Sequence, residues 1–177
     1  MNSAQTLSEA DRRTLARWAA ACAEHVLALF ASDDEAADAT VRDALVRASA
    51  FARGESTAAI EIRRRMEAVK AAGSATTAAG AAAARSVAQA AAVAHVGAHA
   101  LGAAAYAVKA VSLTHGADAA RDEVAWQLAQ LTADERAALR LLPLLGTDPN
   151  GPLGSGLLTQ GILGETVRAI QAATSTA

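Results

Sequence analysis

The chain contains few bulky aromatic side chains, three prolines and a single cysteine. Aromatic residues make up 3% of its 177 residues, although 53% of the residues are hydrophobic. With so few large anchors, we expect Trp18, Phe51 and Tyr106 to be buried. The single cysteine, Cys22, excludes an internal disulfide framework and fits a reducing compartment. The formal net charge of −2 argues against a surface that binds nucleic acid or an anionic membrane.

Targeting and membrane-spanning patterns are also missing. Residues 1–11 have neither the basic start nor the apolar run of a signal peptide. Residues 86–108 are long enough to cross a bilayer, but Gln89, His95 and His99 oppose insertion. We therefore expect a cytoplasmic protein that does not span a membrane.

Alanine supplies most of the apolar residues and is concentrated between Ala71 and Ala110, where it fills more than half of the positions. Alanine is the strongest helix former, and its small side chain lets neighbouring helices approach closely. Glycine weakens a helix and permits a tight turn, so we expect a break near Val96–Gly97. The result is a pair of helices, over about 76–95 and 98–115, which we expect at the centre of the fold.

Capping residues and apolar spacing predict three helices before this pair. We expect Ser8 to cap the first helix, and Ser32 with Glu35 to open the second, which closes at Gly54. The third is predicted as one helix over 56–72, capped by Ser56. Its expected buried face consists of Ile62, Met66 and Val69.

Further helices are predicted after the pair. One begins at Asp118 and has an apolar stripe of Val124, Leu128 and Leu131, and the next runs from the capping box of Thr132 and Glu135 to about Leu145. No strand alternation is found, so the fold class is all-α, a single bundle of about six to eight helices around an alanine-rich central pair. We expect a helical domain over 1–145, then a Gly/Pro-rich linker plus C-terminal helix over 146–177.

The last helix, over about 157–173, is too weak to be stable alone because Gly161 and Gly164 interrupt it. It must dock either on its own chain or on a second copy. The second alternative would give a weak homodimer through the C-terminal segment.

His95 and His99 are the residues whose spacing most suggests a functional site. Residues four apart share a helix face, as in some metal sites, but no third ligand is evident and Gly97 separates them. One hypothesis is a metal-dependent enzyme or ligand-sensing bundle that uses this pair. The other gives both histidines structural, interior roles at the turn, where they bond open carbonyls or side chains of the first helix. We expect no catalytic residue, metal or cofactor.

Three other patterns have simple structural interpretations. The run Arg63–Arg65 spreads over most of a helical turn, so we expect solvated side chains with intrahelical pairs. The acidic run 33–35 with Asp38 could attract a basic partner or serve helix capping. Cys22 and His25 are helix neighbours, but Cys22 lies on the apolar face, so we expect a buried, unreactive thiol.

Four segments together resemble a known family. They are residues 7–24, with Trp18, Cys22 and Glu24; residues 51–55, with Phe51, Arg53 and Gly54; residues 94–110, with His95, His99, Tyr106 and Lys109; and, more weakly, Trp126 with Gln127. Over roughly residues 7–145 the chain resembles the immunity-protein-5-like family of bacterial toxin–immunity systems. The resemblance implies a small, non-enzymatic, cytoplasmic helical protein that binds and neutralises a cognate bacterial toxin.

Overall fold

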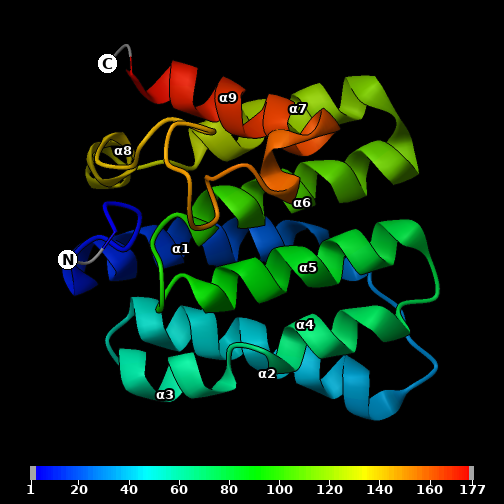
Figure 1. The fold of residues 1–177 in the computed structure, drawn as a ribbon. Helices are drawn as coiled ribbons and strands as arrows, with labels where there is room; N and C mark the ends of the chain where they lie inside the picture. The colour runs from blue at the N-terminus through cyan, green and yellow to red at the C-terminus, as the bar shows by residue number, and fades with distance from the viewer. Residues whose placement is uncertain (1–2, 176–177) are drawn as a thin grey trace.

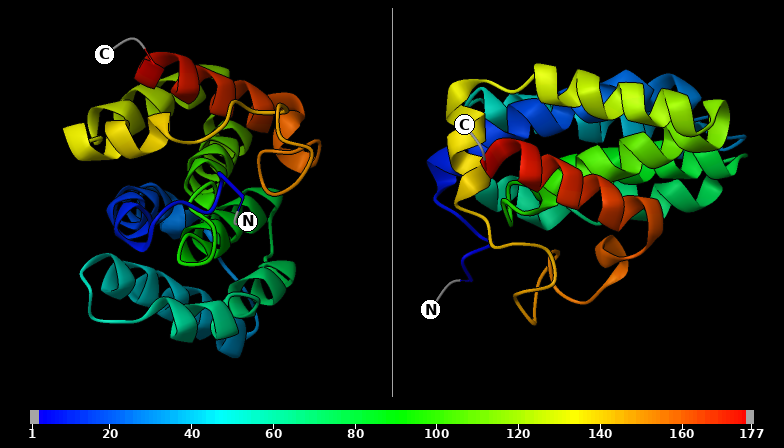
Figure 2. Two further views of the ribbon diagram at one scale, coloured as in Figure 1. Left: turned by 60° about the vertical axis from the view of Figure 1, so that its left-hand side comes forward. Right: turned by 90° about the horizontal axis from the view of Figure 1, so that it is seen from above.

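The computed structural model describes residues 3–175, and the elements in that range are helices arranged in three layers (Figure 1). The views in Figure 2 show the same arrangement from the side and from above. One outer layer contains α2 (Glu35–Ala52), α3 (Ala58–Arg64) and α4 (Glu67–Ala71); the middle layer contains α1 (Glu9–Val26), α5 (Ala78–Ala92) and α6 (His99–His115); the other outer layer contains α7 (Ala117–Ala129), α8 (Ala133–Arg140) and α9 (Gly161–Ser175). Short 3₁₀ turns η1 (Leu27–Leu29), η2 (Ala72–Ser74) and η3 (Leu157–Thr159) lie between helices. The all-α prediction is confirmed.

The predicted alanine-rich pair forms the centre of the bundle as α5 and α6, and the chain turns between them over residues 93–98. Close packing depends on small residues, because a Cβ at Gly102 of α6 would collide with the side-chain oxygen of Gln89 on α5. The buried hydroxyl of Ser86 also donates a hydrogen bond to the carbonyl of Ala103 at 2.7 Å. Alanine and glycine therefore set the distance between the two central helices.

The three aromatic residues expected in the core are buried there. Trp18 and Phe51 are almost fully enclosed, and Tyr106 on α6 is 7% exposed. Phe51 joins α2 to α1, because the guanidinium of Arg13 lies over its ring, with Cζ 4.4 Å from the ring centroid. Few aromatic side chains are present, and these three hold interfaces between helices.

The first two helices begin as local signals predict, with one exception. Ser8 caps α1 by accepting from the backbone N–H of Asp11. The predicted cap of α2, Ser32, is wrong: the carboxylate of Asp34 accepts from the first backbone N–H groups of that helix. The Ser32 hydroxyl donates instead to the carbonyl of Ser74 at 3.0 Å, so it ties the loop before α2 to η2.

The single helix predicted over 56–72 is also wrong, because α3 ends at Arg64 and α4 begins at Glu67. Thr57 caps α3, while Ser56 donates its hydroxyl to Glu61. The expected buried face points outward: Met66 is 48% and Val69 is 46% exposed.

A buried ion pair explains this rotation of α3. Glu61 faces the core, 2% exposed, and its Oε2 lies 2.7 Å from Nη1 of Arg47 on α2. Neither charge can be buried without its partner, so the pair fixes which side of α3 faces α2. Met66 and Val69 are left exposed on the outer side, and Ile62 is half-buried.

The layer formed by α7 and α8 differs from expectation in its buried face. Glu123 and Gln127 of α7 face the core, while Val124 and Leu128 of the predicted apolar stripe are only half-buried. The predicted capping box of Thr132 and Glu135 opens α8 and is confirmed.

The helix α8 ends at Arg140 and does not reach Leu145. Pro143 disfavours helical backbone in the residue before it, which accounts for the earlier end. Glu135 at the other end of α8 is buried and accepts from Nε of Arg17 on α1 at 2.5 Å. That ion pair joins the layer of α8 to the middle layer.

The C-terminal segment docks on its own chain in this structure. Helix α9 packs against α6, with further contacts to α7 and α8. The preceding residues 146–156 are held by Gln5, whose side chain donates to the carbonyl of Asn150 at 2.5 Å and accepts from the N–H of Leu153 at 2.9 Å. The N-terminal segment and the Gly/Pro-rich segment therefore stabilise each other.

Candidate functional site

A groove opens at the end of the bundle where α1 and α6 finish and α7 begins, at the right in Figure 1. Its volume is about 410 Å³. Its lining includes His25 at the end of α1, Val111 and His115 of α6, and Trp126 of α7. A second hollow, lined by η1, the start of α5 and the end of α6, shares Ala28 and Leu29 with the first. We call the two together the end groove.

The end groove has an apolar surface that the chain itself leaves open. Leu113 is 52% exposed, and Leu29, Val111 and Trp126 are each half-buried. Large apolar side chains gathered around a hollow are typical of an interaction site. This end of the bundle is therefore the strongest candidate surface for binding.

His25 is held in the groove wall by two neighbours. Its Nδ1 lies 2.7 Å from Oε2 of Glu123, and its ring stacks on the Trp126 indole with centroids 3.7 Å apart and planes 14° from parallel. The His25 side chain is 43% exposed, whereas that of Glu123 is 3% exposed. A buried carboxylate and an indole thus fix an exposed imidazole, which prepares the surface for contact without further ordering.

A polar layer lies behind the groove wall, between α1, α6 and α7. The side-chain amide of Gln127 donates to Oε1 of Glu123 at 2.9 Å and to the carbonyl of Ala104 at 3.2 Å. Trp18 of α1 donates its indole N–H to the backbone carbonyl of Gln127 at 2.9 Å. These bonds position α7, and with it Trp126, relative to the middle layer.

Cys22 lies one turn from His25 and does not form a reactive pair with it. The thiol is fully buried, and burial together with the nearby carboxylates of Glu123 and Glu135 raises its pKa well above the usual value. At neutral pH it is a protonated thiol in the core, as its place on the apolar face of the helix predicts.

His95 and His99 lie at the opposite end of the bundle, at the turn between α5 and α6 (Figure 1). The interior position expected for both is wrong for His95, which is exposed because the turn projects it outward. His99 is half-buried, and its Nδ1 lies 2.7 Å from Oε1 of Gln89 on α5. The expected partner on the first helix is thus replaced by one on α5.

Burial lowers the pKa of His99 to about 4, with the positive charges of His95 and Arg65 acting in the same direction. Burial also lowers the pKa of His95, helped by Arg65 and Arg12. His99 is therefore neutral at pH 7. Its contact with Gln89 joins the two central helices.

The N-terminal segment holds the same turn from outside. The backbone N–H groups of Gly97 and Ala98 donate to the carbonyls of Thr6 and Gln5, each at 3.1 Å. A Cβ at position 97 would lie 2.7 Å from Cδ1 of Leu7, so a larger residue there would force the Leu7 side chain to move.

The other residues singled out by the family resemblance do not form one site. Gly54 has a φ of +80°, which suits the left-handed backbone that closes α2, and Arg53 beside it pairs with Glu55 at 2.7 Å on the surface. Along the chain the remaining positions have different environments: Phe51 and Tyr106 are buried, Lys109 is half-buried and Glu24 is exposed beside His25. Trp18 and Trp126 are linked through α7, because Trp18 donates to the backbone carbonyl of Gln127, the residue after Trp126.

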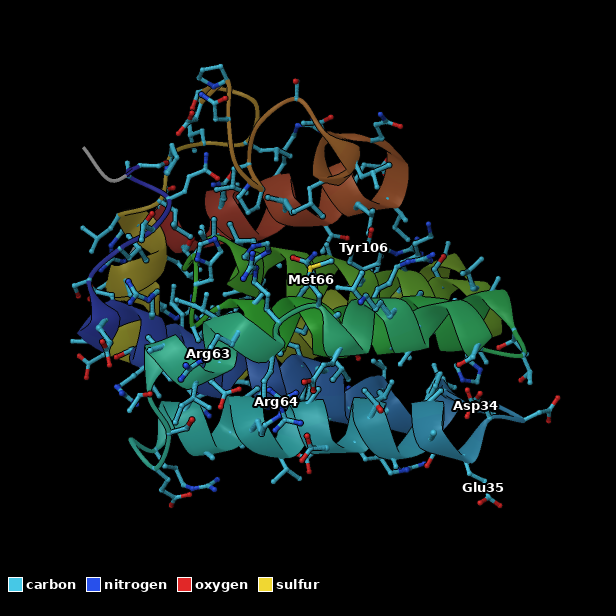
Figure 3. All side chains as sticks on the ribbon, turned by 60° about the horizontal axis from the view of Figure 1, so that its bottom comes forward. Asp34, Glu35, Arg63, Arg64, Met66 and Tyr106 are labelled. Atoms are coloured by element: carbon cyan, nitrogen blue, oxygen red, sulfur yellow. The ribbon has the colours of Figure 1, made fainter. Side chains whose placement is uncertain are left out.

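The arginine run on α3 spreads out, as its spacing predicts. Figure 3 shows Arg64 over α2 and Arg63 apart from it, with Met66 on the outer surface. Arg64 pairs with Glu67 at 2.9 Å and with Asp43 of α2 at 3.0 Å, and Arg65 donates to the carbonyl of Ile62. The three cations therefore do not converge on one ligand.

Sequence reasoning missed most of the end groove. Asp122, Glu123 and His115 belong to none of the predicted sites, Gln127 enters only beside Trp126 in the family resemblance, and His25 only as a neighbour of Cys22. A usable signal existed in Glu123 and Gln127, because two polar residues four apart interrupt the buried side of α7.

Within residues 3–175, no group of three or more histidine, cysteine, aspartate or glutamate side chains is arranged to hold a metal ion. No helix in the described part of the chain combines the length and apolarity needed to cross a bilayer.

One comparison with known proteins gives a match. The family described as "Imm-5 like putative immunity protein" matches residues 5–134, which include all of α1, α6 and α7, the helices that line the end groove. Helix α9 and the segment before it lie outside the match. No curated protein and no solved structure matches the chain.

Proposed function

Because this chain belongs to the Imm-5-like immunity protein family, we propose that it binds a cognate bacterial toxin and neutralises it by stoichiometric binding, without catalysis. The family match carries the proposal, since it extends over every helix of the two layers that form the end groove except α8 and α9. We place this binding in the cytoplasm, which suits a chain whose one cysteine is a buried thiol.

The architecture supports a binding role. A surface whose side chains are already ordered loses little conformational entropy when it meets a partner. His25 and Trp126 are already fixed in the groove wall by Glu123. The alternative function would use His95 and His99 as a site. The His99 imidazole is already bonded to Gln89, and the His95 imidazole is exposed.

A growth experiment tests the proposed function. A candidate toxin, sought among the genes that neighbour the one for this chain, is expressed in a susceptible bacterium together with the wild-type chain. We expect growth to be restored, because toxin bound by the chain cannot act. The matched control is Trp18→Asp, which buries a charge in the core and removes the bond to Gln127.

The control variant should leave the cells as sensitive as those without the chain. Cell death in the presence of abundant, folded wild-type chain would contradict the proposal.

A further inference from the structure

We propose that the end groove is the toxin-binding surface and that it receives a segment of the toxin in which a cationic side chain, best an arginine, lies beside an apolar one. This inference rests on the proposed function and names the surface and the chemistry of the partner. Two properties of the groove lead to it: open apolar side chains and a negative lining.

The apolar part of the segment has a complementary surface in the groove. Leu29, Val111 and Trp126 are half-buried around the hollow, and Leu113 at its edge is 52% exposed. Tryptophan is among the residues that contribute most to binding when a partner covers it. Trp126 cannot shift freely, because its ring is stacked on His25.

The cationic side chain of the toxin segment is inferred from the charges of the residues that line the groove. Asp122 is an exposed carboxylate in the lining of the groove, and Glu123 behind it is buried and bound to His25 and Gln127. Neither of the two hollows contains a lysine or arginine among the described residues. Glu24 is exposed at the same end of α1. The nearby Arg121 is already paired with Asp118. A carboxylate next to apolar surface attracts a cation more strongly than one in open water.

Arginine fits this combination better than lysine does. Its planar guanidinium can pair with a carboxylate such as Asp122 and also stack against aromatic rings such as Trp126. The apolar patch on the outer side of α3 and α4, around Met66 and Val69, offers no such combination, since Arg63 and Arg64 lie beside it.

The chain contains two tryptophans, which makes the groove directly observable. Labelling with 5-fluorotryptophan gives one ¹⁹F resonance from Trp18 in the core and one from Trp126 in the groove, and Trp126→Phe assigns them. The probe is the unlabelled toxin that the wild-type chain neutralises in the growth experiment. We expect toxin to shift or broaden the Trp126 resonance and to leave that of Trp18 in place.

Charge reversal tests the cationic partner. Asp122→Lys should weaken toxin binding by about 100-fold, because it places like charges opposite each other. Asp134→Lys makes the same change in net charge at an exposed position of α8 outside the groove, and it should alter the affinity by less than about threefold.

The outcomes separate the two proposals. Toxin that binds at saturation without affecting Trp126, or that binds both lysine variants equally, overturns the groove assignment and leaves the proposed function standing. A Trp126 resonance that shifts with chain concentration alone shows a second copy in the groove and also overturns it. Absence of any binding by the wild-type chain overturns both.

Discussion

Replacing Arg47 with methionine is expected to lower the free energy of unfolding by about 3–5 kcal/mol. The Arg47 side chain is 10% exposed, and its Nη1 lies 2.7 Å from Oε2 of Glu61, which is 2% exposed. Nε also pairs with Asp43 at 2.9 Å, and Nη2 with Glu67 at 3.2 Å. Without the guanidinium, Glu61 keeps one protein partner, the Ser56 hydroxyl at 2.6 Å, and a buried charge is left without compensation.

Urea denaturation of three variants measures this effect. Arg42→Met removes an exposed arginine from the same helix, where it pairs with Asp38, and should change stability by less than about 1 kcal/mol. In the double variant Arg47→Met/Glu61→Leu no buried charge is left unpaired, so most of the loss should be recovered. A loss below about 1 kcal/mol for Arg47→Met alone would show that the pair does not fix α3 against α2.

Acidification should destabilise the protein through His99. Its pKa is about 4 in the folded chain, below the ordinary value of 6.5 that it regains on unfolding. Because the unfolded state binds the proton more tightly, the stability contributed by neutral His99 is fully present above pH 6.5. It is lost progressively as the pH falls toward 4. We expect the free energy of unfolding to drop by about 2 kcal/mol between pH 8 and pH 5 from this group.

His99→Gln isolates the contribution, because it keeps an amide N–H that can donate to Gln89 and does not titrate. Between pH 8 and pH 5 the free energy of unfolding of the variant should fall by about 2 kcal/mol less than that of the wild type. His95, with its lowered pKa, acts in the same direction in both proteins and cancels in the comparison. Arginine partners lower the pKa values of Asp38 and Glu67, and these groups, present in both proteins, cancel in the same way. Parallel profiles for the two proteins would contradict the buried, neutral state of His99.

Features set by neighbouring residues were predictable from the sequence. The cap at Ser8 and the capping box of Thr132 and Glu135 depend on contacts within one turn. A break between the two alanine-rich helices was also predictable, and in the structure the turn spans residues 93–98 around Gly97. The alanine-rich pair was predictable because helix propensity and small size act in the same direction over a long stretch.

Features set by distant partners were not predictable in this way. The outer face of α3 and α4 depends on Arg47, which lies 14 residues before Glu61 and on another helix. Glu123 faces the core because its carboxylate bonds His25, which lies 98 residues earlier, and accepts a hydrogen bond from Gln127. In both cases the side of the helix that faces the core is decided by a buried polar group that needs a partner, and not by the apolar stripe in the sequence.

The candidate site was predicted in part. The resemblance to the family indicated Trp126 in the groove and Trp18, which bonds the helix that carries it, but also His95 and His99 at the far end of the bundle. The groove is formed by side chains from α1, α6 and α7, and only the fold brings them together.

Titration of the toxin with the chain tests stoichiometric neutralisation most directly. Toxin at a concentration well above the dissociation constant is mixed with increasing amounts of the purified wild-type chain, and the remaining toxin activity is measured at several incubation times. Binding without catalysis predicts a linear decrease that ends at about one chain per toxin molecule and does not change with time. Progressive inactivation by a small fraction of one equivalent would show catalysis, and full activity in the presence of excess chain would show no neutralisation; either result contradicts the account.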